Sequence, residues 1–146
     1  MSNREDDIAS RNEIARIRLE VERLRLNGWY LVMSVPFNRL LAAYNGTGPE
    51  FLPERIRAKL DKIAEPFLPA VMVHDIDFTF SDGTVESFNR ANDRLLENCV
   101  KCALDAHPWH SWRRYALFAK AFAIYRACCK FGWKAWTDAY TDAHLN

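Results

Sequence analysis

The chain has 146 residues and a mass of 17.0 kDa, which is the size of one domain that can bury a core without disulfides or a structural metal. Its hydrophobic fraction of 49% and charged fraction of 27% are ordinary for a soluble globular protein, whereas its aromatic fraction of 13% is high. A formal net charge of +1 predicts no class of partner, so only the distribution of charge along the sequence is informative.

The sequence shows neither a signal peptide nor a membrane-spanning segment. Its first residues include Arg4, Glu5, Asp6 and Asp7, and no apolar run reaches the length of about 18 residues that a span needs. We therefore expect a soluble, unprocessed protein. Its compartment stays open.

Four cysteines are too few for a disulfide scaffold. Cys99 and Cys102 lie three residues apart, and Cys128 is followed directly by Cys129. We expect free, mostly buried thiols, with one disulfide or a cysteine-based metal site as the alternatives.

Residues 5–27 predict a charged helix with one apolar seam. The seam has heptad spacing and continues in register to Leu31, and its members are Ile14, Ile17, Val21 and Leu24. We expect residues 1–30 to form an N-terminal amphipathic helix that either packs on its own domain or binds a second copy or a neighbouring subunit. Residues 31–146 then form the main helical domain.

Gly28 is expected to end the first helix, and two short apolar stretches on either side of Pro36 follow it. The strongest turn signal comes next, at Tyr44-Asn45-Gly46-Thr47-Gly48-Pro49, where two glycines and a proline exclude a continuous helix or strand. Residues 53–64 then predict a short amphipathic helix that begins at its proline.

The stretch of residues 71–80 fits two structures. Apolar and polar residues alternate from Ile76 to Phe80 as in a strand, and Ser81-Asp82-Gly83-Thr84 is typical of a hairpin turn. Helical spacing instead gathers four residues on one face, namely Val71, His74, Asp75 and Phe78. The two alternatives are evenly matched, and a compromise is a helix followed by a short β-wing.

Residues 87–105 predict a helix with two adjacent stripes. One stripe contains Asp93 together with Leu96, Val100 and Ala103, and the other contains Leu95, Cys99 and Cys102. We therefore expect the Asp93 carboxylate to point inward with the apolar side chains.

Residues 112–136 predict the longest helix, with Ser111 as its N-cap, and we expect it to be a core element. One stripe of it consists of Tyr115, Phe118, Phe122, Tyr125 and Cys129. Between His107 and Trp136 there are six Lys and Arg residues and no Asp or Glu. The tail of this helix, Trp133-Lys134-Ala135-Trp136, mixes aromatic and basic groups in the way that is typical of segments that bind a membrane interface, although a solvated helix end is the commoner explanation.

His74 and its neighbours interrupt an otherwise apolar segment. An imidazole or a carboxylate that is buried without a partner costs several kcal/mol, so His74 and Asp75 need a hydrogen bond, a counter-charge or a metal. An inward Asp93 on the next helix is the partner that we expect for His74.

At these places the chain resembles the calcium-dependent phospholipase A2 superfamily, in particular its compact members from viral capsids and phages. Tyr44-Asn45-Gly46-Thr47-Gly48 matches the Y-x-G-x-G calcium loop, and His74-Asp75-Ile76-Asp77-Phe78 matches the H-D-x-x-Y helix except at its last residue. The segment Arg90-Ala91-Asn92-Asp93 is also similar to the phage members, so the resemblance spans residues 44–102.

The resemblance implies a mainly α fold, a small phospholipase A2-like domain of about four to five helices with a short β-wing. It implies that His74 is the general base that activates a water and that Asp93 orients the imidazole. The implied Ca2+ ligands are Asp75 and the backbone carbonyls of Tyr44, Gly46 and Gly48, and the ion polarises the sn-2 ester carbonyl. Phe78 replaces the family's Tyr, so a hydroxyl that would bind the buried carboxylate is missing.

Two functions follow from these observations. The first is a Ca2+-dependent phospholipase A2-like hydrolase of phage origin that cleaves the sn-2 ester of phospholipids at a membrane surface. The second is a non-catalytic phage structural or protein-interaction protein that keeps the fold and binds itself or another phage subunit through the N-terminal helix. Nucleic-acid binding by the basic C-terminal helix is not expected, because that helix is too apolar and no reading motif is present.

Overall fold

The computed structural model describes residues 2–44 and 54–145, and these residues form eight α-helices and one short 3₁₀ helix, with no strand in either range. In chain order the elements are α1 (Ser2–Arg23), α2 (Trp29–Ser34), α3 (Phe37–Ala43), α4 (Glu54–Ala64), η1 (Glu65–Phe67), α5 (Leu68–Thr79), α6 (Val85–Ala106), α7 (Trp112–Phe131) and α8 (Trp133–Leu145). The mainly α class is therefore confirmed, with more helices than the sequence predicted.

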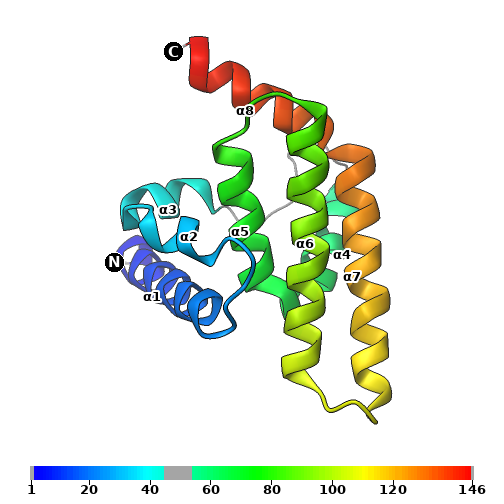
Figure 1. Ribbon diagram of the computed structural model, residues 1–146. Coiled ribbons are helices and arrows are strands. Elements are labelled where there is room, and N and C mark those ends of the chain that lie inside the picture. The colour runs from blue at the N-terminus through cyan, green and yellow to red at the C-terminus, as the bar shows by residue number, and fades with distance from the viewer. Residues whose placement is uncertain (1, 45–53, 146) are drawn as a thin grey trace.

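Helix α5 lies at the centre of this arrangement. It contacts α1, α2, α3, α6 and α8, and Figure 1 shows it between the group of α1, α2 and α3 on one side and the antiparallel pair of α6 and α7 on the other. Its buried residues are Ala70, Met72, Val73, His74 and Ile76. Because neighbours cover several sides of α5, its polar residues must find partners within the protein.

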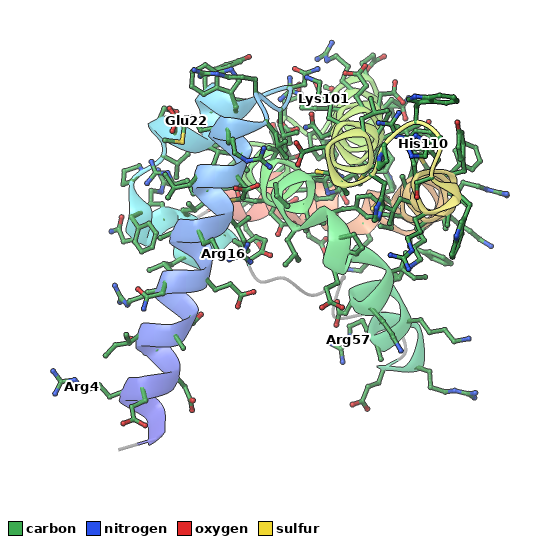
Figure 2. The ribbon with its side chains drawn as sticks, turned by 90° about the horizontal axis from the view of Figure 1, so that it is seen from below. Arg4, Arg16, Glu22, Arg57, Lys101 and His110 are labelled. Atoms are coloured by element: carbon green, nitrogen blue, oxygen red, sulfur yellow. The ribbon has the colours of Figure 1, made fainter. Side chains whose placement is uncertain are left out.

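One hydrophobic core joins the N-terminal helix to the rest of the described chain. Ile14, Ile17 and Val21 of α1 belong to the same buried cluster as residues of α5, α6 and α7. The apolar seam of α1 therefore packs on its own chain. Residues 4–13 are exposed, and Figure 2 shows that this end of α1 extends away from the body, with Arg4 near its tip.

The β-wing expected around Asp82 and Gly83 is wrong, because the chain turns there from α5 directly into α6. Helix α5 continues to Thr79, which decides between the two alternatives for that stretch. The Asp82 carboxylate accepts hydrogen bonds from the Thr84 N–H at 2.9 Å and from the Ser87 hydroxyl at 2.6 Å, and the Thr84 side chain caps α6. Asp, Thr and Ser thus begin a helix here instead of a hairpin.

The single helix predicted over residues 112–136 is two helices. Helix α7 ends at Phe131 and the chain then turns into α8, which leaves the direction of α7 (Figure 1). The Trp136 carbonyl accepts a 2.8 Å hydrogen bond from the Ser81 hydroxyl, and the Trp136 indole N–H donates to the Thr84 carbonyl at 3.1 Å. These two bonds fix α8 against the connection between α5 and α6.

The inward face of α7 also differs from the one that the aromatic stripe predicted. Leu117, Ala121 and Ile124 are the buried residues of α7, whereas Tyr115 and Phe122 are exposed. Aromatic side chains of this helix therefore lie on the surface of the described structure. No helix in the described ranges is long and apolar enough to cross a bilayer.

All four cysteines are free thiols, as the sequence predicted. Cys99 and Cys102 are buried, Cys128 is partly buried and Cys129 is exposed. Burial raises the pKa of the Cys128 thiol to about 12, so this thiol stays protonated at neutral pH.

Asn98 of α6 holds the connection between α1 and α2. Its Oδ1 atom accepts a 2.7 Å hydrogen bond from the Asn27 N–H, and its Nδ2 atom donates to the Asn27 carbonyl at 2.9 Å. Asn98 is fully buried, so removal of its amide would leave two backbone groups without these partners.

We expect Asn98→Ala to lower the free energy of unfolding by about 2–3 kcal/mol, because two hydrogen bonds between a fully buried amide and the backbone of Asn27 are lost. Urea denaturation followed by circular dichroism measures the change. Asn12→Ala, at an exposed position of α1, is the matched control and should change the free energy by less than about 0.5 kcal/mol. Equal losses in the two variants would contradict a specific role for the contact between Asn27 and Asn98.

Candidate functional site

His74 lies in the middle of α5 and is buried against α6. Its Nε2 atom donates a 3.0 Å hydrogen bond to the Oδ1 atom of Asn92, and its ring lies 4.4 Å from the Phe78 ring, centroid to centroid. With the Asn92 amide in this orientation, the imidazole proton is on Nε2 and the lone pair is on Nδ1. One polar and one aromatic contact therefore orient the ring.

The surroundings of His74 keep its imidazole neutral. Burial lowers the pKa of His74 to about 4, and the hydrogen bond to Asn92 opposes this shift only in part. A neutral imidazole with its lone pair on Nδ1 can accept a proton. The imidazolium that results is costly in a buried site unless an anion stabilises it, and Asn92 is not charged.

The inward orientation predicted for Asp93 is wrong. Asp93 is exposed, and its Oδ1 atom accepts a 3.1 Å hydrogen bond from the Tyr125 hydroxyl of α7. Asn92, one residue earlier, lies on the buried face of α6 and makes the contact with His74. The structure thus does not bring the Asp93 carboxylate to the imidazole.

Asn92 is a site residue that was not predicted from the sequence, because the expected partner of His74 was a carboxylate. The stripe of Leu95, Cys99 and Cys102 has helical spacing that reaches Asn92 when it is extended three residues toward the N-terminus. All four residues are buried. The signal was therefore present in the same stripe, with an amide in place of the expected acid.

Asp75 follows His74 on α5 but lies in different surroundings. It is partly buried, and its Oδ2 atom is fully buried and has no hydrogen-bond partner among the described residues. Burial raises the pKa of Asp75 to about 8. Tyr44, whose backbone carbonyl is another predicted Ca2+ ligand, is the C-cap residue of α3, and α3 contacts α5.

The remaining predicted ligands, Gly46 and Gly48, lie outside the described residues. In the parts of the chain that the structure describes, no group of three or more His, Cys, Asp or Glu side chains could hold a metal ion. Asp75 nevertheless fits a cation site, because its buried oxygen lacks a hydrogen bond and a cation would favour the ionised carboxylate.

Asp77, the other carboxylate of this segment, is paired through one oxygen, while its Oδ2 atom is buried without a partner among the described residues. Its Oδ1 atom lies 2.8 Å from Nη1 of Arg94, which links α5 to α6. Burial raises the pKa of Asp77 to about 6, and the charge of Arg94 opposes the shift. Gly28 packs closely against this pair, because a Cβ atom at that position would lie 2.9 Å from Arg94 Nη1.

No protein-family model, curated protein or solved structure matches this chain. The resemblance to phospholipases A2 therefore depends on the motif residues themselves. Among them, His74 and Asp75 share helix α5, and Tyr44 ends helix α3, which contacts α5.

The titration of Asp75 predicts how stability depends on pH. Its pKa is about 8 in the folded chain, against an ordinary value of 3.8. In the window between these two pH values, the folded state keeps a proton on Asp75 that the unfolded state has released. Stability therefore falls as the pH rises through the window. His74 acts in the opposite direction, but only between its lowered pKa of about 4 and its ordinary value of 6.5.

In chelator, we expect the free energy of unfolding to fall by up to about 2 kcal/mol between pH 6.5 and pH 8. Asp75→Asn should remove most of this fall, because the amide does not titrate. Urea denaturation at a series of pH values measures both slopes, with Asp142→Asn, at an exposed position, as the control that keeps the wild-type slope. A flat wild-type profile over this window would contradict the assignment.

Proposed function

We propose that the protein is a phospholipase A2-like hydrolase that cleaves the sn-2 ester of phospholipids, with His74 as its general base. The hydrogen bond from His74 to Asn92 carries the proposal, because it orients a neutral imidazole that has its lone pair on Nδ1. The adjacent Asp75 supports a cation site beside this base, since its buried Oδ2 atom has no hydrogen-bond partner within the described ranges.

His74 accepts a proton on Nδ1 from a water molecule as the water oxygen attacks the ester carbonyl. Its Nε2–H stays bound to Asn92, which keeps one tautomer and one ring orientation throughout. The proton then moves from Nδ1 to the leaving alcohol oxygen, so that ester and water give a fatty acid and a lysophospholipid.

The cation of this proposal is Ca2+, held by Asp75 and by the backbone carbonyls of Tyr44, Gly46 and Gly48. When bound, it supplies Lewis acidity for the ester carbonyl. Asp75 would hold the ion only in its ionised form, so the proton that burial favours on this carboxyl would oppose cation binding.

Asn92 is a positioning residue in this mechanism. Its amide oxygen holds the Nε2–H of His74 but carries no charge, so it stabilises the imidazolium less than a carboxylate would. The proposal therefore includes a slow proton transfer, which an acid at this position would accelerate.

We expect hydrolysis of a fluorogenic phospholipid to require Ca2+ and to fall by about a hundredfold or more in His74→Ala, because the general base is lost. Asn92→Ala should reduce turnover by about tenfold or more, since the ring loses its orienting partner. Asn92→Asp should keep or raise turnover, because a carboxylate also accepts the Nε2 proton.

Asp93→Asn is the matched control for these variants. It should leave turnover unchanged, because Asp93 contacts Tyr125 and not His74. Circular dichroism verifies that each variant is folded. Equal turnover in chelator, or in His74→Ala and the wild type, would overturn the mechanism, and a larger loss in Asp93→Asn than in Asn92→Ala would restore Asp93 as the orienting residue.

The second candidate is a non-catalytic phage structural or interaction protein, which two observations favour. A buried histidine with an amide partner and an aromatic neighbour also satisfies the needs of a structural core residue. Residues 4–13 of α1 are exposed and extend from the body (Figure 2), so they are accessible to a second copy or to another subunit.

For this second candidate, we expect removal of residues 1–11 to lower the mass measured by light scattering to that of one chain. The cut precedes Ile14, the first buried residue of α1, so the core and the midpoint of thermal unfolding should change little. An unchanged mass would exclude self-association through α1.

A further inference from the structure

One side of α7 carries exposed aromatic and basic side chains. We call this surface the α7 outer face, and its residues are Trp109, Trp112, Arg113, Tyr115, Lys120, Phe122, Arg126 and Lys130. Trp109 and Trp112 are each 73% exposed, and Tyr115 and Phe122 are more than half exposed. Large aromatic side chains gathered at this level of exposure indicate an interaction surface.

The helical geometry explains why these residues occur together. Successive residues of an α-helix are rotated by about 100°, so Trp112, Ala119 and Lys130 lie nearly opposite the buried Leu117 and Ala121. Tyr115 and Phe122 flank this line on one side, and Arg113 and Lys120 flank it on the other. Trp112, Tyr115, Phe122, Arg126 and Lys130 thus share one exposed face about 80° wide, which extends at one end to the Trp109 loop, and Arg113 and Lys120 border it on the side away from Tyr115 and Phe122.

The α7 outer face is uniformly positive. No Asp or Glu occurs between His107 and Trp136, and in the described residues the ion pairs do not include Arg113, Lys120, Arg126 or Lys130. Arg113 and Lys130 instead lie over neighbouring aromatic rings, at 5.9 and 5.3 Å from the centroids. The charge of this face is therefore not neutralised by ion pairs within the described structure.

We propose that the α7 outer face docks on an anionic phospholipid surface. Trp and Tyr side chains are favoured at the level of lipid headgroups, where an apolar ring and a polar tip are both accommodated. Lys and Arg side chains are attracted by the negative surface potential of anionic lipids. This face offers both kinds of group side by side, without an acidic residue that would repel the lipid.

Two other occupants fit this surface less well. A second copy of the chain would bring two basic faces together, and like charges repel. Single-stranded nucleic acid is bound in grooves that follow its backbone, whereas the α7 outer face is the convex side of a helix.

Docking is separate from the proposed hydrolysis. Vesicle binding requires neither His74 nor Ca2+, so it can be measured in chelator, where turnover is not expected. A failure of docking and a failure of hydrolysis are therefore distinguishable.

The test is cosedimentation of the full chain, in chelator, with vesicles of phosphatidylcholine alone or of phosphatidylcholine and phosphatidylglycerol in equal parts. We expect binding to the anionic vesicles only, weakened by added salt. Lys120→Glu combined with Arg126→Glu should lower the affinity by about thirtyfold. Arg4→Glu combined with Lys59→Glu, the same charge change on α1 and α4, should lower it by less than about threefold.

The aromatic contribution has its own pair of variants. Trp109→Ala combined with Trp112→Ala should lower the affinity by about tenfold, because two interfacial anchors are lost. Leu145→Ala, at a residue that is 79% exposed, is the control and should leave binding unchanged. Because the substituted side chains are exposed, none of these variants should unfold the protein.

The following outcomes would overturn the proposal. One is equal binding to neutral and anionic vesicles, and another is equal binding by the wild type and the Lys120→Glu, Arg126→Glu variant. Binding to a single-stranded DNA oligonucleotide without binding to vesicles would assign the face to nucleic acid. A dimer abolished by the same two substitutions, again without vesicle binding, would assign it to a second copy.

Discussion

Helix α5 can occupy the centre of the protein because α6 supplies partners for its polar side chains. His74 binds the amide of Asn92, and one oxygen of Asp77 pairs with Arg94, so α6 both covers α5 and supplies partners for these two side chains. Asp75 differs, since no described side chain bonds its carboxyl group and its Oδ2 atom is buried, whereas Asp77 has an unpartnered Oδ2 atom but an ion pair through Oδ1. An uncompensated carboxyl at the centre of a fold lowers stability, and it is at such positions that a functional requirement is expected.

Periodicity predicted α1, α4 and α6 within a few residues of their observed ends, because each has a polar face that contrasts with an apolar one. Periodicity failed for α7 because this helix has apolar residues on all sides. The large aromatic side chains were therefore predicted to face the core, whereas Leu117, Ala121 and Ile124 are the buried residues. The Asp82-Gly83 sequence was ambiguous for another reason. The same side-chain hydrogen bonds that close a turn also cap a helix, and only the packing of α6 decides between them.

The site shows a similar limit. That His74 is buried and needs a partner could be predicted from its apolar neighbours, and so could the helix that provides the partner. The identity of the partner could not, because one residue of difference rotates a side chain by about 100° and a neutral amide accepts a hydrogen bond as a carboxylate does. It matters chemically that the partner of His74 is Asn92 and not Asp93, because the negative charge that we predicted beside the imidazole is then absent.

The contact between Asn27 and Asn98 has a consequence for the order in which the chain folds. The two residues are 71 positions apart, and the amide of Asn98 replaces the bonds that the backbone of Asn27 would otherwise make with water. During synthesis, α1 and its following turn therefore leave the ribosome well before the helix that holds them exists. Closing so long a segment is entropically unfavourable and slow relative to local helix formation. Helix α1 is thus synthesised before the helices that it packs against. Until those helices fold, its apolar seam is exposed and can aggregate.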